Sequence, residues 1–233
     1  MKRIFWVVVT VFIIIVIYII NIDRRVLVFA VGDSIAMGKT DIGSITKSPN
    51  IYVKEYLEKE DKLEKYIDNY QKKGLRISDI INDINNNKKI SYKDKSYTIK
   101  NVLIKSDLVI ISINNDDFLN RVFTYYNIEE LYNWVDEMTI EYENMISLIR
   151  EYCKEKVIVT GYYYPNSLNI NQEIINLISY LNNKFLEISK INDIEYIDIF
   201  SLLVEKDNII GKRYPTELGY KLIGEAIIKK LNY

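Results

Sequence analysis

The chain has 233 residues, of which 48% are hydrophobic and 27% charged, and its formal net charge is -1. This length is enough for one domain with a sizeable core, and the charge balance argues against nucleic acid as a partner, because binding phosphates requires a basic field. The chain contains no histidine, so a reaction catalysed here must do without the usual general base near neutral pH. Cys153 is the only cysteine, which excludes an internal disulfide.

An uninterrupted apolar run lies near the N-terminus. Residues 4–20 carry no charge, and Lys2 and Arg3 precede them. As a helix this run would extend about 26 Å, enough for a thin bilayer. Bulky and charged residues follow, with no small-residue cleavage site, so residues 1–25 are expected to form an uncleaved signal anchor with one transmembrane helix. The domain of residues 26–233 would then lie outside the cytoplasm, although Arg24 and Arg25 weaken the orientation signal.

The clearest strand follows directly. Residues 26–31, VLVFAV, predict a buried strand from the middle of a parallel sheet. The strand runs into Gly32, Asp33 and Ser34, which places the serine at the carboxyl end of the sheet, where ligands bind in open α/β folds. A serine on a sharp strand-to-helix turn can serve as a nucleophile. The alternative is that Asp33 or Ser34 only caps the next helix.

The remaining chain alternates between strands and helices. Further strands are expected at residues 66–70, 107–113, 156–162 and 195–199. Apolar residues at helical spacing predict helices at residues 52–63, 77–84, 128–153, 174–188 and 218–231. Residues 40–50 are expected to be a loop, and residues 85–95 a solvated loop or helix end. This alternation predicts a single α/β domain with a parallel sheet covered by helices on both faces.

Four blocks carry a family resemblance. They are GDSIAMG (32–38), GLRISDII (74–81), DLVIISINNDDF (107–118) and YPTELGYKLIGEAI (214–227). In these blocks the chain resembles the SGNH/GDSL hydrolases, esterases and lipases with a flavodoxin-like three-layer α/β/α fold, and is most similar to the bacterial branch with an N-terminal membrane segment. The resemblance implies that Ser34 is the nucleophile and that the backbone N–H groups of Ser34 and Gly74 donate to the oxyanion.

The same blocks depart from the family where its chemistry resides. Asp116 stands where the family has the amide that donates to the oxyanion, and Asn114 where it has a glycine. Tyr214 stands where the family has the catalytic histidine, and Gly211 where it has the aspartate that orients that histidine. A shift of the third block by one residue would instead align Asn115 and Asp116 with the family's Asn-Asp pair, at the expense of the glycine and of an apolar residue.

These departures weaken the usual mechanism. A serine hydroxyl needs a base, a phenol with a pKa near 10 is protonated at neutral pH, and a carboxylate accepts hydrogen bonds without donating them. The first hypothesis is therefore a membrane-anchored, catalytically degenerate domain that binds a glycan, a lipid or a protein.

The alternative is an active esterase or lipase-type hydrolase that attacks an acyl ester with Ser34 and a base other than histidine. Four lysines lie near the blocks in sequence: Lys39, Lys72, Lys73 and Lys212. A phosphate or nucleotide binder is a weaker third hypothesis, because the turn after the first strand lacks a glycine-rich cradle. No cofactor or metal is expected, since no cluster of ligating residues has metal-site spacing.

Overall fold

A five-stranded parallel sheet forms the centre of the molecule. The computed structural model describes residues 6–7, 9–12, 25–168, 171–204 and 209–231. The strand order is β2-β1-β5-β6-β7, and every pairing is parallel. The strands are β1 (Val26–Gly32), β2 (Leu63–Gln71), β5 (Leu108–Ser112), β6 (Lys156–Thr160) and β7 (Glu195–Ile197).

The sheet is doubly wound: successive strands are added in one direction from β1 to β2 and in the opposite direction from β5 onward, so the switch point lies between β1 and β5. All residues of both strands are buried, which explains their unbroken apolar sequences. The connection from β1 runs outward to β2, whereas the chain continues from β5 to β6 and β7 on the other side. In such sheets the carboxyl ends at the switch point form the usual ligand crevice.

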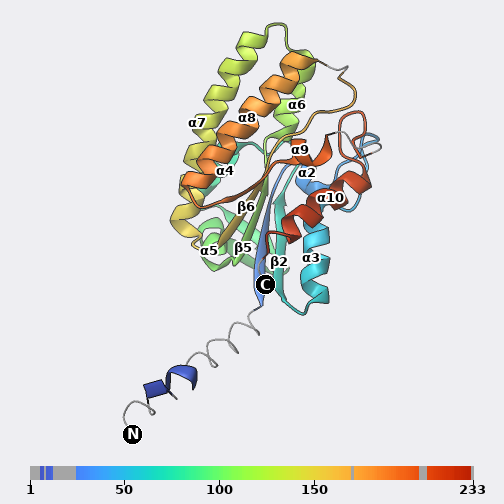
Figure 1. The fold of residues 1–233 in the computed structure, drawn as a ribbon. Coiled ribbons are helices and arrows are strands. Elements are labelled where there is room, and N and C mark those ends of the chain that lie inside the picture. The colour runs from blue at the N-terminus through green and yellow to red at the C-terminus, as the bar shows by residue number, and fades with distance from the viewer. Residues whose placement is uncertain (1–5, 8, 13–24, 169–170, 205–208, 232–233) are drawn as a thin grey trace.

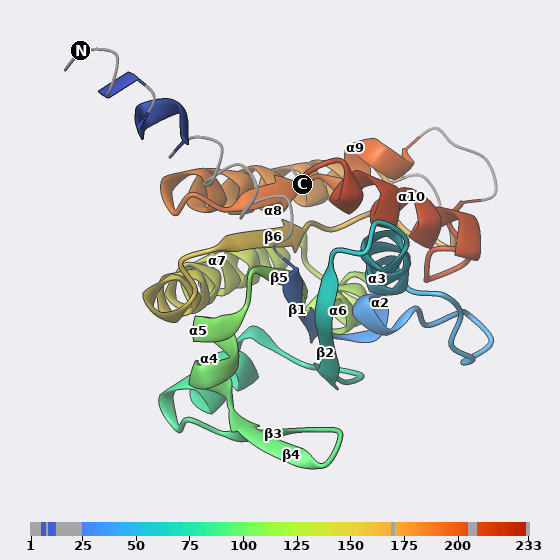
Figure 2. The ribbon, with the colours of Figure 1, turned by 90° about the horizontal axis from the view of Figure 1, so that it is seen from below.

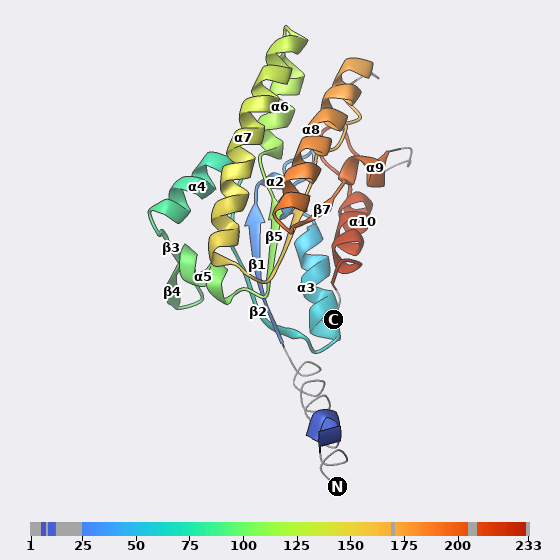
Figure 3. The same ribbon diagram turned by 60° about the vertical axis from the view of Figure 1, so that its left-hand side comes forward.

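Helices cover both faces of the sheet, which makes three layers (Figures 1 and 3). One face carries α2 (Ser34–Met37), α3 (Pro49–Lys59) and α10 (Glu217–Ile228). The other carries α4 (Ile77–Asn85), α5 (Ile99–Lys105), α7 (Ile128–Tyr152) and α8 (Gln172–Ile191). Two shorter connections are also helical, α6 (Asn115–Thr124) after β5 and α9 (Ile199–Leu203) after β7.

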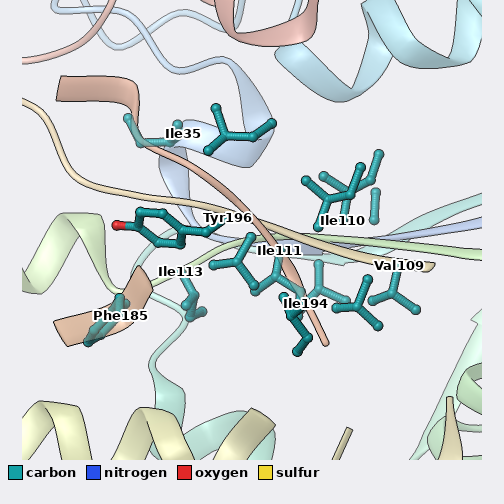
Figure 4. Close-up of a cluster of buried hydrophobic side chains, with 14 of the residues drawn as sticks. Ile35, Val109, Ile110, Ile111, Ile113, Phe185, Ile194 and Tyr196 are labelled. Carbon is teal, nitrogen blue, oxygen red and sulfur yellow. The ribbon is translucent and has the colours of Figure 1, made fainter. Parts of the chain in front are cut away.

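Buried side chains pack on both sides of the central strands. Figure 4 shows Ile110 of β5 on the same side as Ile35, whereas Val109 and Ile111 point to the opposite side. Side chains alternate along a strand, so each strand contributes to two apolar layers. On the α7–α8 side, the rings of Tyr142 and Phe185 stack with centroids 3.7 Å apart.

The expectation of a transmembrane helix is corrected by the described part of the structure. Within the part of the chain that the structure describes, no helix is long and apolar enough to cross a membrane. The described helical residues of the apolar run are 6–7 and 9–12. Most of the expected anchor, residues 1–5, 8 and 13–24, lies outside the described residues. The extracytoplasmic location stays a prediction.

Several element boundaries also differ from expectation. Helix α3 starts at Pro49, because Ser48 caps it and proline suits the first turn, and it ends at Lys59, so that Leu63 opens β2 instead. Part of the stretch 85–95, expected as a loop or helix end, forms β3 (Lys89–Tyr92), which pairs with β4 (Lys95–Thr98). This hairpin lies apart from the central sheet (Figure 2).

Candidate active site

The turn after β1 is built by a glycine and a capping aspartate. A Cβ atom on Gly32 would overlap the backbone oxygen of Ser112 in β5, so only glycine allows the two strand ends to approach this closely. Asp33 caps α2 by accepting a hydrogen bond from Ile35 N (3.1 Å). Its second oxygen accepts from Asp116 N (3.1 Å), which ties the β1 turn to the β5 turn. Ser34 follows as the first residue of the helix.

Four of the residues singled out in the sequence, namely Ser34, Gly74, Asp116 and Tyr214, form one hydrogen-bonded cluster, and Asp116 lies at its centre. Its Oδ2 accepts from Ser34 Oγ (2.6 Å), Gly74 N (2.9 Å) and, over a longer distance, Ser34 N (3.4 Å). Its Oδ1 accepts from the hydroxyl of Tyr214 (2.9 Å). The cluster joins the carboxyl ends of β1, β2 and β5 to the loop before α10.

The position of Asp116 Oδ2 has a chemical meaning. Its two backbone donors, the N–H groups of Ser34 and Gly74, are those that the family resemblance assigns to the oxyanion. An oxyanion site is a set of donors aimed at a developing negative oxygen. Here a carboxylate oxygen of the protein itself already meets those donors.

The two buried aspartates of the site carry different charges. Burial, together with the negative charge of Asp116, raises the pKa of Asp33 to about 8. Burial alone would also raise the pKa of Asp116, but hydrogen bonds from Ser34, Gly74 and Tyr214 hold it below its ordinary value. Near neutral pH, Asp116 is therefore ionised and Asp33 mostly protonated, which avoids two adjacent buried charges.

Tyr214 is a hydrogen-bond donor in this site. Burial and the neighbouring Asp116 carboxylate raise its pKa to about 12, so its phenol is protonated at neutral pH. The phenol accepts a hydrogen bond from Lys39 Nζ (3.0 Å) while it donates to Asp116. Tyr214 cannot take a proton from Ser34 in this state.

Gly211 does not join the cluster, and the side chain of Asp41 occupies the space beside it. A Cβ atom at Gly211 would overlap Asp41 Oδ2. The Asp41 carboxylate accepts from the backbone N–H groups of Lys212 (2.5 Å), Arg213 (2.8 Å) and Tyr214 (3.0 Å). Asp41 thus holds the loop in place, but its oxygens face the backbone and not a side chain at position 214.

The β5 turn shows how Asn114 fits where the family has glycine. Asn114 has φ 63°, a left-handed conformation that asparagine tolerates better than most residues. Its amide donates to Met138 Sδ, and the neighbouring Asn115 amide donates to Ile113 O. Neither amide is directed at Ser34, so the residue that faces the serine from this turn is Asp116.

In the described part of the chain, no lysine nitrogen is hydrogen-bonded to Ser34 Oγ. Lys39 donates to Tyr214, which donates to the Asp116 carboxylate that Ser34 Oγ contacts. A lysine would have to lie within hydrogen-bond reach to act as its base.

A cleft of about 560 Å³ opens beside the cluster. Its lining includes Lys39, Asp41, Gly74, Asp116 and Tyr214. Ser34 has 0% of its surface exposed, whereas Asp116 retains 7%, and it is Asp116 that belongs to the lining of the cleft. Within the described residues, no group of three or more acidic, cysteine or histidine side chains could hold a metal ion.

The sheet is doubly wound, and Ser34 lies on the turn after its first strand. Gly74 and Asp116, which follow β2 and β5, meet beside that serine. This arrangement defines an α/β domain of the SGNH hydrolase class. The family model described as GDSL-like lipase/acylhydrolase matches residues 28–227, and the chain belongs to this family.

Solved structures share the fold. A lipase from a goat rumen metagenome is 18% identical, with a TM-score of 0.70 over 88% of this chain and 97% of its own. An acetylxylan esterase from Geobacillus stearothermophilus is 14% identical, with a TM-score of 0.65 over 91% and 96% of the two chains. A lipase/acylhydrolase from Enterococcus faecalis is 19% identical, with a TM-score of 0.57 over 89% and 95%. No curated protein matches the chain.

The sequence did not reveal the roles of Asp41 and Arg213. Arg213 Nη2 donates to the backbone oxygen of Asp116 (3.4 Å) and to Asn120 Oδ1 (2.6 Å). Both residues lie in loops, and the contact between residue 41 and residues 212–214 exists only in the tertiary structure. The only local signal was the position of Arg213 directly before Tyr214.

Proposed function

We propose that this GDSL-family domain binds a ligand in the cleft beside Ser34 without hydrolysing it. The observation that supports this proposal most directly is that Asp116 Oδ2 accepts hydrogen bonds from Ser34 Oγ, Ser34 N and Gly74 N together. A substrate oxygen could reach these donors only by displacing a carboxylate. A negatively charged oxygen in the same place would also be repelled by that carboxylate.

The energetic cost of losing an oxyanion donor and the general base supports the proposal. Loss of a single oxyanion donor typically costs about 3–4 kcal/mol of transition-state stabilisation. Loss of the general base removes several further powers of ten in rate. Both losses fall on attack by Ser34, because the chain has no histidine and position 116 carries an acceptor.

The class of ligand follows from the fold and its relatives. The structures with this fold include proteins described as lipases and as an acetylxylan esterase. A degenerate relative would keep a cleft for an ester-bearing glycan or lipid, or for the product left after de-esterification. The cleft of about 560 Å³ has a size typical of small-molecule sites.

Ester turnover tests the proposal. The full-length chain is incubated with p-nitrophenyl acetate beside its Ser34→Ala variant. The two should release p-nitrophenol at the same slow rate, because Ser34 is not activated. A rate for the unmodified chain around 1 per second or more, an ordinary enzymatic value, that disappears in Ser34→Ala would refute the proposal.

A second candidate function rests on one contact. The 2.6 Å separation of Ser34 Oγ and Asp116 Oδ2 is short enough for proton transfer, so Asp116 could act as the base of an active esterase. The lowered pKa of Asp116 makes it a weak base, and its Oδ2 would have to leave the oxyanion donors during the same step. If Asp116 is the base, Asp116→Asn will reduce Ser34-dependent turnover to the level of Ser34→Ala.

A further inference from the structure

The cleft beside Asp116 contains two carboxylates whose oxygens are already used by the protein. Asp116 accepts from Ser34, Gly74 and Tyr214. Asp41 accepts from the three consecutive backbone N–H groups of residues 212–214. Hydrogen bonds to an ionised carboxylate are strong and directional, so these two acids have little capacity left for a cationic ligand.

Three cations line the same cleft: Lys39, Lys73 and Arg213. Within the described part of the chain, none of them is in an ion pair with a carboxylate side chain. Lys39 Nζ donates to the neutral phenol of Tyr214, and Arg213 Nη2 donates to neutral oxygens. The lining of the cleft therefore carries three cations against two carboxylates, and although the charge of Lys39 acts on Asp116, none of the three cations is in a direct ion pair with either acid.

Arg213 is also held in a fixed orientation. Its guanidinium carbon lies 5.4 Å from the centroid of the Phe123 ring and 5.7 Å from that of Tyr214. Its Nε is buried and has no acceptor among the described residues. A guanidinium positioned by aromatic rings is suited to a planar or tetrahedral oxyanion, which would meet its terminal nitrogens because Nε is buried.

We propose that the cleft binds an anionic ligand, one that presents a carboxylate or phosphate group to Lys39, Lys73 and Arg213. This inference rests on the proposed binding function and names its ligand chemistry. The ionised Asp116 at the floor repels the charged group from the oxyanion donors. The group therefore binds nearer to Lys73 and Arg213, and the uncharged part of the ligand lies over Asp116 and Gly74.

Ligand-observed NMR titration of the full-length chain tests this charge preference. The probes are glycerol 3-phosphate, trigalacturonic acid and the neutral sugar xylotriose. The first two distinguish a phosphate from a carboxylate source, and at least one of them should bind more tightly than xylotriose. Its dissociation constant should rise with added NaCl, because salt screens partly exposed charges.

A matched pair of lysine variants locates the site. Lys73→Gln removes a charge from the cleft and should weaken binding of the charged probe about two- to fivefold, the range for partly exposed ion pairs. Lys73→Arg should restore it. Lys105→Gln is the control, because this exposed lysine ends α5 at the amino end of β5, away from the cleft, and it should leave binding unchanged.

Three results would overturn the inference: binding of neither charged probe, equal binding of xylotriose, or equal effects of Lys73→Gln and Lys105→Gln. Ester turnover is measured separately with p-nitrophenyl acetate. Rapid Ser34-dependent turnover would refute the non-hydrolytic function, whereas the charge preference of the cleft would still be decided by the titration.

Discussion

At the scale of single residues, one chemical difference governs the site. An amide at position 116 could donate to a substrate oxygen, whereas the carboxylate of Asp116 can only accept. In the structure, this carboxylate accepts hydrogen bonds from Gly74 N at 2.9 Å and from Ser34 Oγ at 2.6 Å. The chain thus satisfies the N–H groups of Ser34 and Gly74 with an internal anion, so neither of these two donors is free for a substrate.

Asp33 leads to a prediction on pH. Its pKa is about 8 in the folded chain against 3.8 for an ordinary aspartate, so the folded state binds an extra proton between these values. The free energy of unfolding therefore falls as pH rises through this window. Between pH 6 and 8, where the absence of histidine leaves few other groups to titrate, the fall should be about 2 kcal/mol.

Urea unfolding at several pH values measures this effect. Asp33→Asn cannot ionise, so its free energy of unfolding should be nearly constant from pH 6 to 8. A flat profile for the unmodified chain would show that Asp33 is ionised in the folded state, in spite of its burial.

Tyr214 and Asp116 lead to a prediction on restored chemistry. Tyr214→His alone should give no ester turnover above that of Ser34→Ala, because Asp116 still meets the oxyanion donors. Asp116→Asn with Tyr214→His should give measurable turnover, since groups that act as a unit are far from additive. Turnover from the single Tyr214→His variant would mean that the carboxylate does not block the site.

Addition of an aspartate at position 211 should not help this restoration. A side chain on Gly211 would overlap the carboxylate of Asp41, which holds the backbone of residues 212–214. Gly211→Asp is therefore expected to lower the melting temperature of the doubly substituted chain. An increase in turnover without loss of stability would show that the loop can rearrange.

At the scale of elements, strand ends and their turns decide where the site forms. Ser34 follows β1, Gly74 follows β2 and Asp116 follows β5, so three neighbouring strands bring these residues together. Their approach depends on Gly32, whose missing side chain makes room for Ser112 O. The turn is thus as much a packing requirement as a chemical one.

Two glycine-to-alanine substitutions distinguish the effect of close packing at Gly32 from that of backbone conformation alone. Gly32→Ala should destabilise the chain by about 3 kcal/mol or more, because its Cβ meets strand backbone that cannot move aside. Gly43→Ala is the control: Gly43 has φ 82° but nothing within 4 Å of an added Cβ, so only backbone strain of about 1–2 kcal/mol is expected. Equal losses in chemical denaturation would contradict the close packing of β1 and β5.

The strongly apolar elements could be predicted from sequence, whereas the β3–β4 hairpin and the start of α3 could not. The β1, β5 and β6 segments stand out because they are buried on both faces. The β3–β4 hairpin contains only one buried residue, Ile90, and its Lys- and Ser-rich sequence gives no clear period. The start of α3 depended on Ser48 and Pro49, a capping signal that the apolar spacing did not include.

At the scale of the whole molecule, the blocks predicted where the site lies but not its internal contacts. Ser34, Gly74, Asp116 and Tyr214 meet because they follow strands or open a helix in a known fold. The sequence indicated that a carboxylate at position 116 would oppose an oxyanion. The sequence could not show that this carboxylate occupies the position of the oxyanion, or that Asp41 fills the space beside Gly211. Both features depend on side-chain orientation in the folded chain.

The most direct test of the account is the labelling rate of Ser34 by a fluorophosphonate probe, followed by intact mass on the full-length chain. The unmodified chain should label slowly, because its serine is buried and its oxyanion donors are engaged by Asp116. Asp116→Asn should label at least about tenfold faster, since it frees those donors and adds one. Rapid labelling of the unmodified chain that Asp116→Asn abolishes would contradict the account and identify Asp116 as a base.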